Sequence, residues 1–262
     1  MTATDAPLNT PRATPRTTPP TTRHVAPLAT IALTYRVVLR QLTSRSRIVG
    51  LTLLAMIAPV SGFALGSADA SLDDAVRLVA SVGLGLVLPV VSLVFAGAAI
   101  GDLRDDKTLV YLWLRPMDRW PIVVGAALAA GTLIAPITLI PIVAAAILTG
   151  AGNGIVGATL LASVVGLIAY VCVFTLLGVW LKRFIVWGLA YVLIWEGFIA
   201  QAGGGVARVA LRGYTRSILV EQTGVDLRFA GFSLVMSIIV PLAIAATALA
   251  IASWRLSSQD ID

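Results

Sequence analysis

The sequence has very few of the residues that metal sites and nucleophilic active sites depend on. Among its 262 residues there is one cysteine, Cys172, and one histidine, His24. A single cysteine excludes a disulfide within the chain. Because His24 lies in a stretch rich in Thr and Pro, neither a Ser–His protease site nor a His-ligated metal site is expected.

Nucleotide-binding motifs are also missing. The sequence contains no Gly-Lys pair, so it has no P-loop, and it has no HExxH motif of a zinc protease. We therefore expect a protein that is not an enzyme, has no ATP site of its own and carries no cofactor or metal.

Charge is scarce as well. Only 12% of the residues are charged and 58% are hydrophobic, and the mean hydropathy is +0.93. Soluble domains are about a quarter charged. Here the apolar residues form runs of roughly 20 or more, which is enough for a helix to cross about 30 Å of hydrocarbon. The fold class is therefore an all-α membrane protein, and nucleic acid is not an expected partner despite the net charge of +6.

Six transmembrane helices are predicted from the apolar runs. They cover residues 48–66, 75–100, 121–148, 155–181, 184–200 and 231–254. With both termini in the cytoplasm, fourteen of the 19 Lys and Arg residues lie inside and five outside. This distribution follows the positive-inside rule and predicts an N-in/C-in topology, with 257–262 as a cytoplasmic tail. Residues 201–230 are expected to form a short helix or re-entrant segment at the outer surface.

The region before the first span divides into two parts. Residues 1–27 are rich in Thr and Pro and predict a disordered tail rather than a signal peptide. Residues 28–47 predict an amphipathic interfacial helix on the membrane surface. A cytosolic helix packed on a partner is the alternative. One face would carry Ile31, Tyr35, Val38 and Leu42, and the opposite face Arg36, Arg40 and Arg47.

A polar segment at 101–120 separates two of the long apolar runs. Asp105 and Asp106 suit the start of a helix, an apolar patch follows at 108–114, and Pro116 ends the helix. The acidic residues of the segment could be imagined as a metal site. The interleaved Arg and Lys residues favour a solvated charged segment instead.

The same segment resembles a motif of the ABC-2 class of ATP-binding-cassette transporter permeases, which are membrane subunits of bacterial exporters. The matching residues are Asp102, Asp105-Asp106-Lys107-Thr108-Leu109, Tyr111-Leu112, Arg115-Pro116, Arg119 and Gly125. The preceding amphipathic helix, the six spans and the outer segment also follow that family's plan. Two positions depart from it: Asp102 replaces a common Glu, and Lys107 replaces the usual Gly.

The resemblance implies a permease that lies in the inner membrane and pairs with itself or with a sister chain. A separate ATPase subunit would drive it through a coupling helix in the 101–120 loop, and the direction would be export. Apart from the resemblance, the few polar groups in the spans favour a hydrophobic or amphiphilic substrate. The residues that would couple to the ATPase are Asp102, Asp105, Asp106, Thr108, Leu109, Leu112, Leu114 and Arg115. The competing hypotheses are a membrane scaffold or assembly factor without an ATPase, and a secondary transporter.

Two outer residues are candidates for a substrate path or gate. Glu196 lies within an apolar run, where a charge costs at least about 2.5–3.5 kcal/mol, so it should face protein or water. The alternatives are a structural pair with Arg208, Arg212 or Arg216, and a position close enough to the outer surface to be hydrated. Tyr214 resembles a position in some permeases of the class.

Overall fold

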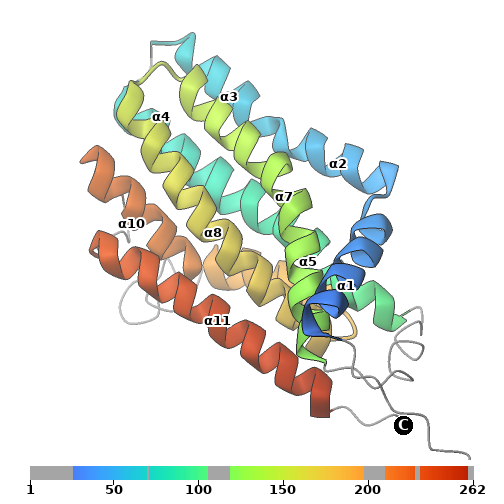
Figure 1. Ribbon diagram of the computed structural model, residues 1–262. Coiled ribbons are helices and arrows are strands. Elements are labelled where there is room, and N and C mark those ends of the chain that lie inside the picture. The colour runs from blue at the N-terminus through green and yellow to red at the C-terminus, as the bar shows by residue number, and fades with distance from the viewer. Residues whose placement is uncertain (1–25, 70, 106–118, 198–209, 228–230, 259–262) are drawn as a thin grey trace, which may run out of the picture.

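The computed structural model describes residues 26–69, 71–105, 119–197, 210–227 and 231–258, and within these ranges every regular element is a helix (Figure 1). No strand occurs in them, so the all-α prediction is confirmed for the part of the chain that the structure describes.

In the described ranges, five helical stretches are long and apolar enough to cross a membrane. They are Arg45–Gly66, Leu72–Asp102, Trp120–Leu148, Gly154–Trp180 and Leu234–Ser258. These correspond to five of the six predicted spans, and they identify the chain as a multi-pass, all-helical membrane protein. The predicted span at 184–200 corresponds to a shorter apolar helix, Phe184–Glu196.

The long stretches are built from the following elements. The first contains α2 (Arg45–Ala55) and α3 (Ile57–Gly66), and the second contains α4 (Leu72–Leu78), the π-helix η1 (Val79–Val87) and α5 (Leu88–Asp105). The others are α7 (Trp120–Leu148), α8 (Asn153–Trp180) and α11 (Leu234–Ser258). Proline residues inside α7 and α11 do not end these helices.

Glycine permits close contact between the long helices. A Cβ on Gly62 of α3 would lie 2.6 Å from the carbonyl oxygen of Ala145 in α7, so the two backbones are in direct contact there. Gly97 of α5 contacts Gly178 of α8 in the same way. Without hydrophobic attraction between helices in lipid, such small residues allow the van der Waals packing that joins them.

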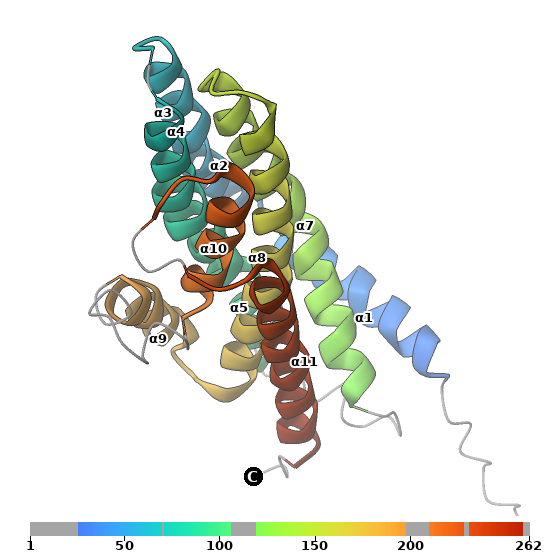
Figure 2. The ribbon, with the colours of Figure 1, turned by 90° about the vertical axis from the view of Figure 1, so that its left-hand side faces the viewer.

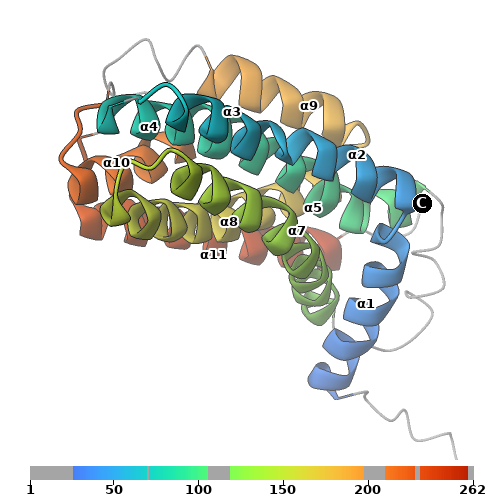
Figure 3. The ribbon, with the colours of Figure 1, turned by 90° about the horizontal axis from the view of Figure 1, so that it is seen from above.

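The first helix, α1 (Pro27–Leu42), crosses the end of the bundle instead of continuing into α2 (Figure 3). The predicted helix over 28–47 is therefore too long. It ends at Leu42, because Thr43 leaves the helical conformation, with φ of −78° and ψ of 55°. Arg47 consequently belongs to α2 and does not share a helix with Arg36 and Arg40.

The two faces of α1 are otherwise as expected. Val38 and Leu42 are buried against the bundle, and Arg36 and Arg40 are exposed. The helix packs on α7, where the missing side chain of Gly125 lets its backbone approach closely. The buried side of α1 also includes two threonines, Thr30 and Thr34.

Between α8 and α11 the chain forms α9 (Phe184–Ala190), the π-helix η2 (Tyr191–Glu196) and α10 (Leu211–Thr223) (Figure 2). The Phe184 ring lies against Gly97 and Gly101 near the end of α5, so α9 starts at that end of the bundle. Thr215 of α10 lies against Gly166, in the middle of α8.

We call α9–η2 and α10 the discontinuous pair, because one segment leads from an end of the bundle to its middle and the other starts there. α10 ends at Gly224, which adopts a left-handed conformation with φ of 71°. The short helix expected within 201–230 is present. It begins inside the bundle, and most of its residues are buried.

Candidate functional site

The most unusual polar group of the bundle is the carboxylate of Glu196, at the end of η2. The side chain is 1% exposed, which satisfies the expectation that it faces protein. The Tyr170 hydroxyl donates to Oε2 at 2.6 Å, and the Tyr191 hydroxyl donates to Oε1 at 3.0 Å. An ionised carboxylate only accepts hydrogen bonds, so two hydroxyl donors suit it.

The same carboxylate connects the two halves of the discontinuous pair. It interacts favourably with the backbone amide and with the guanidinium of Arg212, the second residue of α10. The first amides of a helix have no partner within the helix and form its positive end, where an acidic group is stabilised. Glu196 thus offsets the partial positive charge at the buried start of α10. The Nε of Arg212 is itself buried and has no hydrogen-bond partner among the described residues.

Both π-helical segments border this cluster. η2 ends at Glu196, and η1 contributes Gly85, whose added Cβ would lie 2.5 Å from Nη2 of Arg212. Segments of π-helix are rare and frequently occur at functional sites. The Phe174 ring stacks on Tyr170 and meets Tyr191 edge-on, with centroid distances of 5.7 and 6.3 Å, so the two hydroxyl donors are held by packing.

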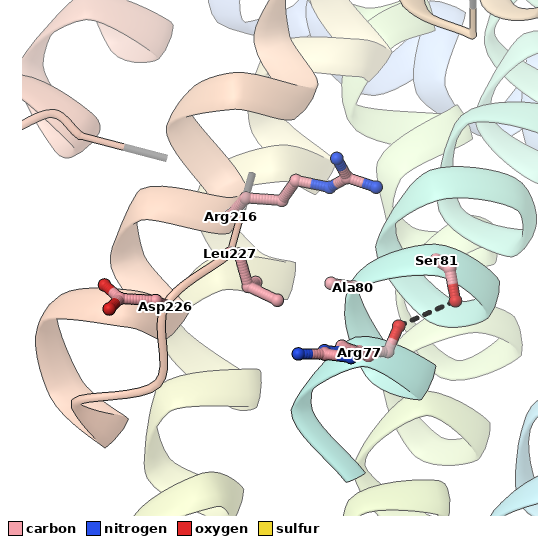
Figure 4. A pocket seen from close by; sticks show the side chains of 6 residues that line it. All are labelled: Arg77, Ala80, Ser81, Arg216, Asp226 and Leu227. Carbon is pink, nitrogen blue, oxygen red and sulfur yellow. Dashed lines mark hydrogen bonds between the residues drawn. The ribbon is translucent and has the colours of Figure 1, made fainter. Parts of the chain in front are cut away.

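A cavity of about 430 Å³ lies between α10 and the α4–η1 stretch (Figure 4). Its lining consists of Arg77, Ala80, Ser81, Arg216, Asp226 and Leu227. The side chains of Arg77 and Arg216 extend into the space from opposite sides, whereas Asp226 points away from both. Arg216 is partly buried, and its Nε has no hydrogen-bond partner within the described ranges.

A second cavity, of about 410 Å³, is apolar and lies between α7, α8 and α11. Its walls include Leu128, Ile168 and Leu249, and its few polar atoms come from Thr132 and Cys172. Such a cavity can accommodate hydrocarbon and offers little to a sugar or an ion.

The two flanks of the charged 101–120 segment are each fixed to a helix distant in sequence. Asp102, near the end of α5, forms an ion pair with Arg47 of α2 at 3.0 Å. Arg119, just before α7, donates to the carbonyls of Leu256 and Ser257 in α11 at 2.9 and 3.0 Å. These flanks lie at the same end of the bundle as α1 and the end of α11 (Figure 1).

Most of the predicted coupling residues fall outside the described ranges. These are Asp106, Thr108, Leu109, Leu112, Leu114 and Arg115. Asp105 is the last residue of α5, and Asp102 is described in full. Within the described ranges no group of three or more His, Cys, Asp or Glu residues could hold a metal ion.

The predicted gate residues are only partly brought together. Tyr214 is buried in α10 two residues after Arg212, and its ring stacks on Phe232 at a centroid distance of 4.6 Å. Of the three arginines considered as partners of Glu196, Arg212 is beside it and Arg208 lies outside the described ranges.

Sequence reasoning missed Tyr170 and Tyr191 as partners of Glu196. One signal was available, because a phenolic hydroxyl inside an apolar run needs a hydrogen-bond partner once it is buried. The spacing was misleading. Tyr191 precedes Glu196 by five residues. In an α-helix, residues five apart do not lie on the same face, but in a π-helix they do.

Comparison of the sequence with models of known protein families finds no match, and comparison with curated proteins finds no match either. The function must therefore be inferred from the residues and their arrangement.

Proposed function

We propose that this chain is the membrane-spanning permease subunit of an ATP-binding-cassette transporter. It would act as a homodimer or beside a sister chain, and a separate ATPase subunit would supply the energy. The observation that carries the proposal is the discontinuous pair, with a buried ionisable cluster where η2 and the start of α10 meet. An inert scaffold has no need for this arrangement.

Two physical arguments support transport. Ionisable residues within membrane helices are costly and usually mark substrate or ion pathways. Discontinuous helices near the middle of the membrane form such sites in transporters, with helix ends directed at charged groups. Here Glu196 and the start of α10 form that combination, bordered by Gly85 of η1 and by Tyr170 of α8.

The source of energy is proposed from the charged segment at 101–120. Because the sequence lacks a P-loop, a partner must bind the nucleotide and bias the conformational equilibrium. A force applied to this segment would reach α2 through Asp102 and Arg47. It would also reach α11 through Arg119. In this proposal the segment contains the coupling helix, with Leu109, Leu112 and Leu114 facing the ATPase.

The proposed topology has six crossings, both termini in the cytoplasm, and the discontinuous pair as the fifth crossing. Supporting it, α8 ends and α11 ends at the same end of the bundle, so the chain must return between them (Figure 1). The bacterial inner membrane and export are proposed on the family resemblance. The apolar cavity between α7, α8 and α11 supports a hydrophobic or amphiphilic substrate.

Co-purification from the native membrane tests the coupling. The tagged chain, solubilised in mild detergent, is expected to bring down a protein that carries a P-loop. The combined variant Leu109→Asp, Leu112→Asp and Leu114→Asp is expected to lose it. Leu72→Asp is the control, because Leu72 is exposed in the first turn of α4, where an acidic residue is tolerated.

Three results would contradict the proposal. Recovery of the folded chain with no ATPase would favour the scaffold. Equal loss of the ATPase in the Leu72→Asp control would contradict the assignment of the contact to the 101–120 segment. Transport by reconstituted chain alone, driven by an ion gradient, would indicate a secondary transporter, in which discontinuous helices also occur.

A further inference from the structure

Among the residues that the structure describes, positive charge gathers around α10 without enough carboxylates to balance it. Arg212 and Arg216 lie one turn apart on this helix, and Arg212 repels the guanidinium of Arg216. Glu196 is the buried carboxylate beside them, and it is already bonded by two tyrosines and by the start of α10. One carboxylate can neutralise one arginine, so a surplus positive charge stays partly buried at Arg216.

The other acidic side chains near this end do not supply the missing charge. Asp226 is exposed and points away from Arg216 (Figure 4), and Glu221 is exposed on α10. Asp73 lies 3.8 Å from Arg77, one turn earlier in α4. The neighbouring segments 198–209 and 228–230, which lie outside the described ranges, contain no Asp or Glu in their sequence. An arginine cannot lose its proton under ordinary conditions, so Arg216 requires an anion.

The cavity beside Arg216 has the chemistry to hold one. Arg77 extends into it from the opposite side, so two guanidinium groups on different elements face the same space (Figure 4). The Ser81 hydroxyl is not offered to an anion in this cavity, because it already donates to the carbonyl of Arg77 at 2.7 Å. Guanidinium groups bind phosphate oxygens with paired hydrogen bonds.

We propose that the cavity between α10 and α4–η1 is a binding site for a phosphate group, with Arg216 as its buried ligand and Arg77 as its exposed ligand. The volume of about 430 Å³ exceeds what phosphate alone fills, and Ala80 and Leu227 line part of the wall with apolar atoms. A phosphate ester fits this combination. Its source is either the headgroup of a membrane lipid or a soluble phosphate compound.

Two probes distinguish these sources with the purified full-length chain. In an uncharged detergent, the thermal unfolding temperature is measured with and without inorganic phosphate at low concentration. In the second arm, the chain is placed in nanodiscs of phosphatidylglycerol or of a phosphate-free glycolipid. Native mass spectrometry then counts the phospholipid that the protein retains. The test variant is Arg216→Gln, and Lys182→Gln in the exposed turn after α8 is the matched control.

Arg216→Gln is expected to weaken phosphate or phospholipid binding about ten- to a hundredfold, as loss of a charged hydrogen-bond donor does. Without the ligand this variant should unfold at the same temperature as the native chain or higher, because it removes an uncompensated buried charge. Stabilisation by inorganic phosphate supports a soluble ligand, and retention of phosphatidylglycerol without stabilisation by inorganic phosphate supports a lipid headgroup. In both cases Lys182→Gln should behave as the native chain.

The proposal is overturned if inorganic phosphate does not stabilise the native chain and the chain retains no phosphatidylglycerol, or if Arg216→Gln responds as the native chain does. It is also overturned if Arg216→Gln lowers the unfolding temperature equally with and without the probes, since that result marks a purely structural side chain. Asp226→Asn gives an independent check and should bind phosphate at least as well. A loss of stability in Asp226→Asn that phosphate does not restore would identify Asp226 as the partner of Arg216.

Discussion

The hydrogen bond between Tyr170 and Glu196 should be one of the strongest single side-chain interactions in this bundle. Its length of 2.6 Å lies in the range of a hydroxyl bound to a charged oxygen, and both residues are almost completely buried. Hydrogen bonds to charged groups contribute about 1.5–3 kcal/mol. Neutral side-chain pairs between membrane helices average about 0.6 kcal/mol.

A double-mutant cycle can separate these values. Tyr170→Phe removes the hydroxyl, and Glu196→Met removes the carboxylate at similar volume. The coupling between the two changes is expected at about 1.5–3 kcal/mol of unfolding free energy. The matched control is the bond from the Tyr35 hydroxyl to Thr132, which joins α1 and α7 at 3.3 Å and is neutral and exposed. With Tyr35→Phe and Thr132→Val, the expected coupling is about 0.6 kcal/mol or less.

The free energies would be measured by reversible unfolding of each variant in the same detergent or bicelle. Since the cycle cancels the separate effects of each substitution, cavity formation at either position does not distort the coupling. A coupling for Tyr170 and Glu196 that is no larger than the control would refute the view that η2 is fixed to α8 by a charged hydrogen bond.

Three further predictions concern the glycine contact between α5 and α8, the hydrogen bonds of Arg119, and the carboxylate of Glu196. Gly178→Ala should cost about 1–3 kcal/mol of unfolding free energy, because the methyl group would meet the backbone of Gly97. Gly157→Ala in the same helix has open space and should stabilise by about 0.5–1 kcal/mol, so equal effects would contradict the contact. Arg119→Gln should speed amide hydrogen exchange in the last turn of α11, and unchanged exchange would show that this anchor contributes nothing. Glu196→Gln should slow transport in reconstituted vesicles at normal membrane abundance, and an unchanged rate would make Glu196 purely structural.

Much of the fold follows from local sequence properties. The apolar runs are long enough to define five helices within a few residues of their predicted limits, because length and hydropathy decide membrane insertion. The faces of α1 followed from periodicity, although the end of the helix did not. The helix ends where Thr43 takes up a non-helical conformation, with ψ of 55°.

The candidate site was harder to predict. Glu196 stood out because a charge in an apolar run is costly, but its partners come from α8, η2 and α10. No local pattern indicates that α10 begins beside the middle of α8. That contact exists because Gly166 has no side chain where Thr215 packs, and because Gly85 makes room for Arg212.

The sequence by itself determined the chemical class of this protein: helical, apolar enough to be embedded in a membrane, without a P-loop motif, and marked by one polar segment between apolar runs. Hydropathy and charge are properties of each residue, so they can be read from the sequence without knowledge of the fold. Only the tertiary structure decided that residues 196 and 212 meet, and that Arg216 and Arg77 extend into one cavity while Asp226, which also lines it, points away. Such pairings depend on which helices approach closely, and that is set by the packing of whole helices against one another.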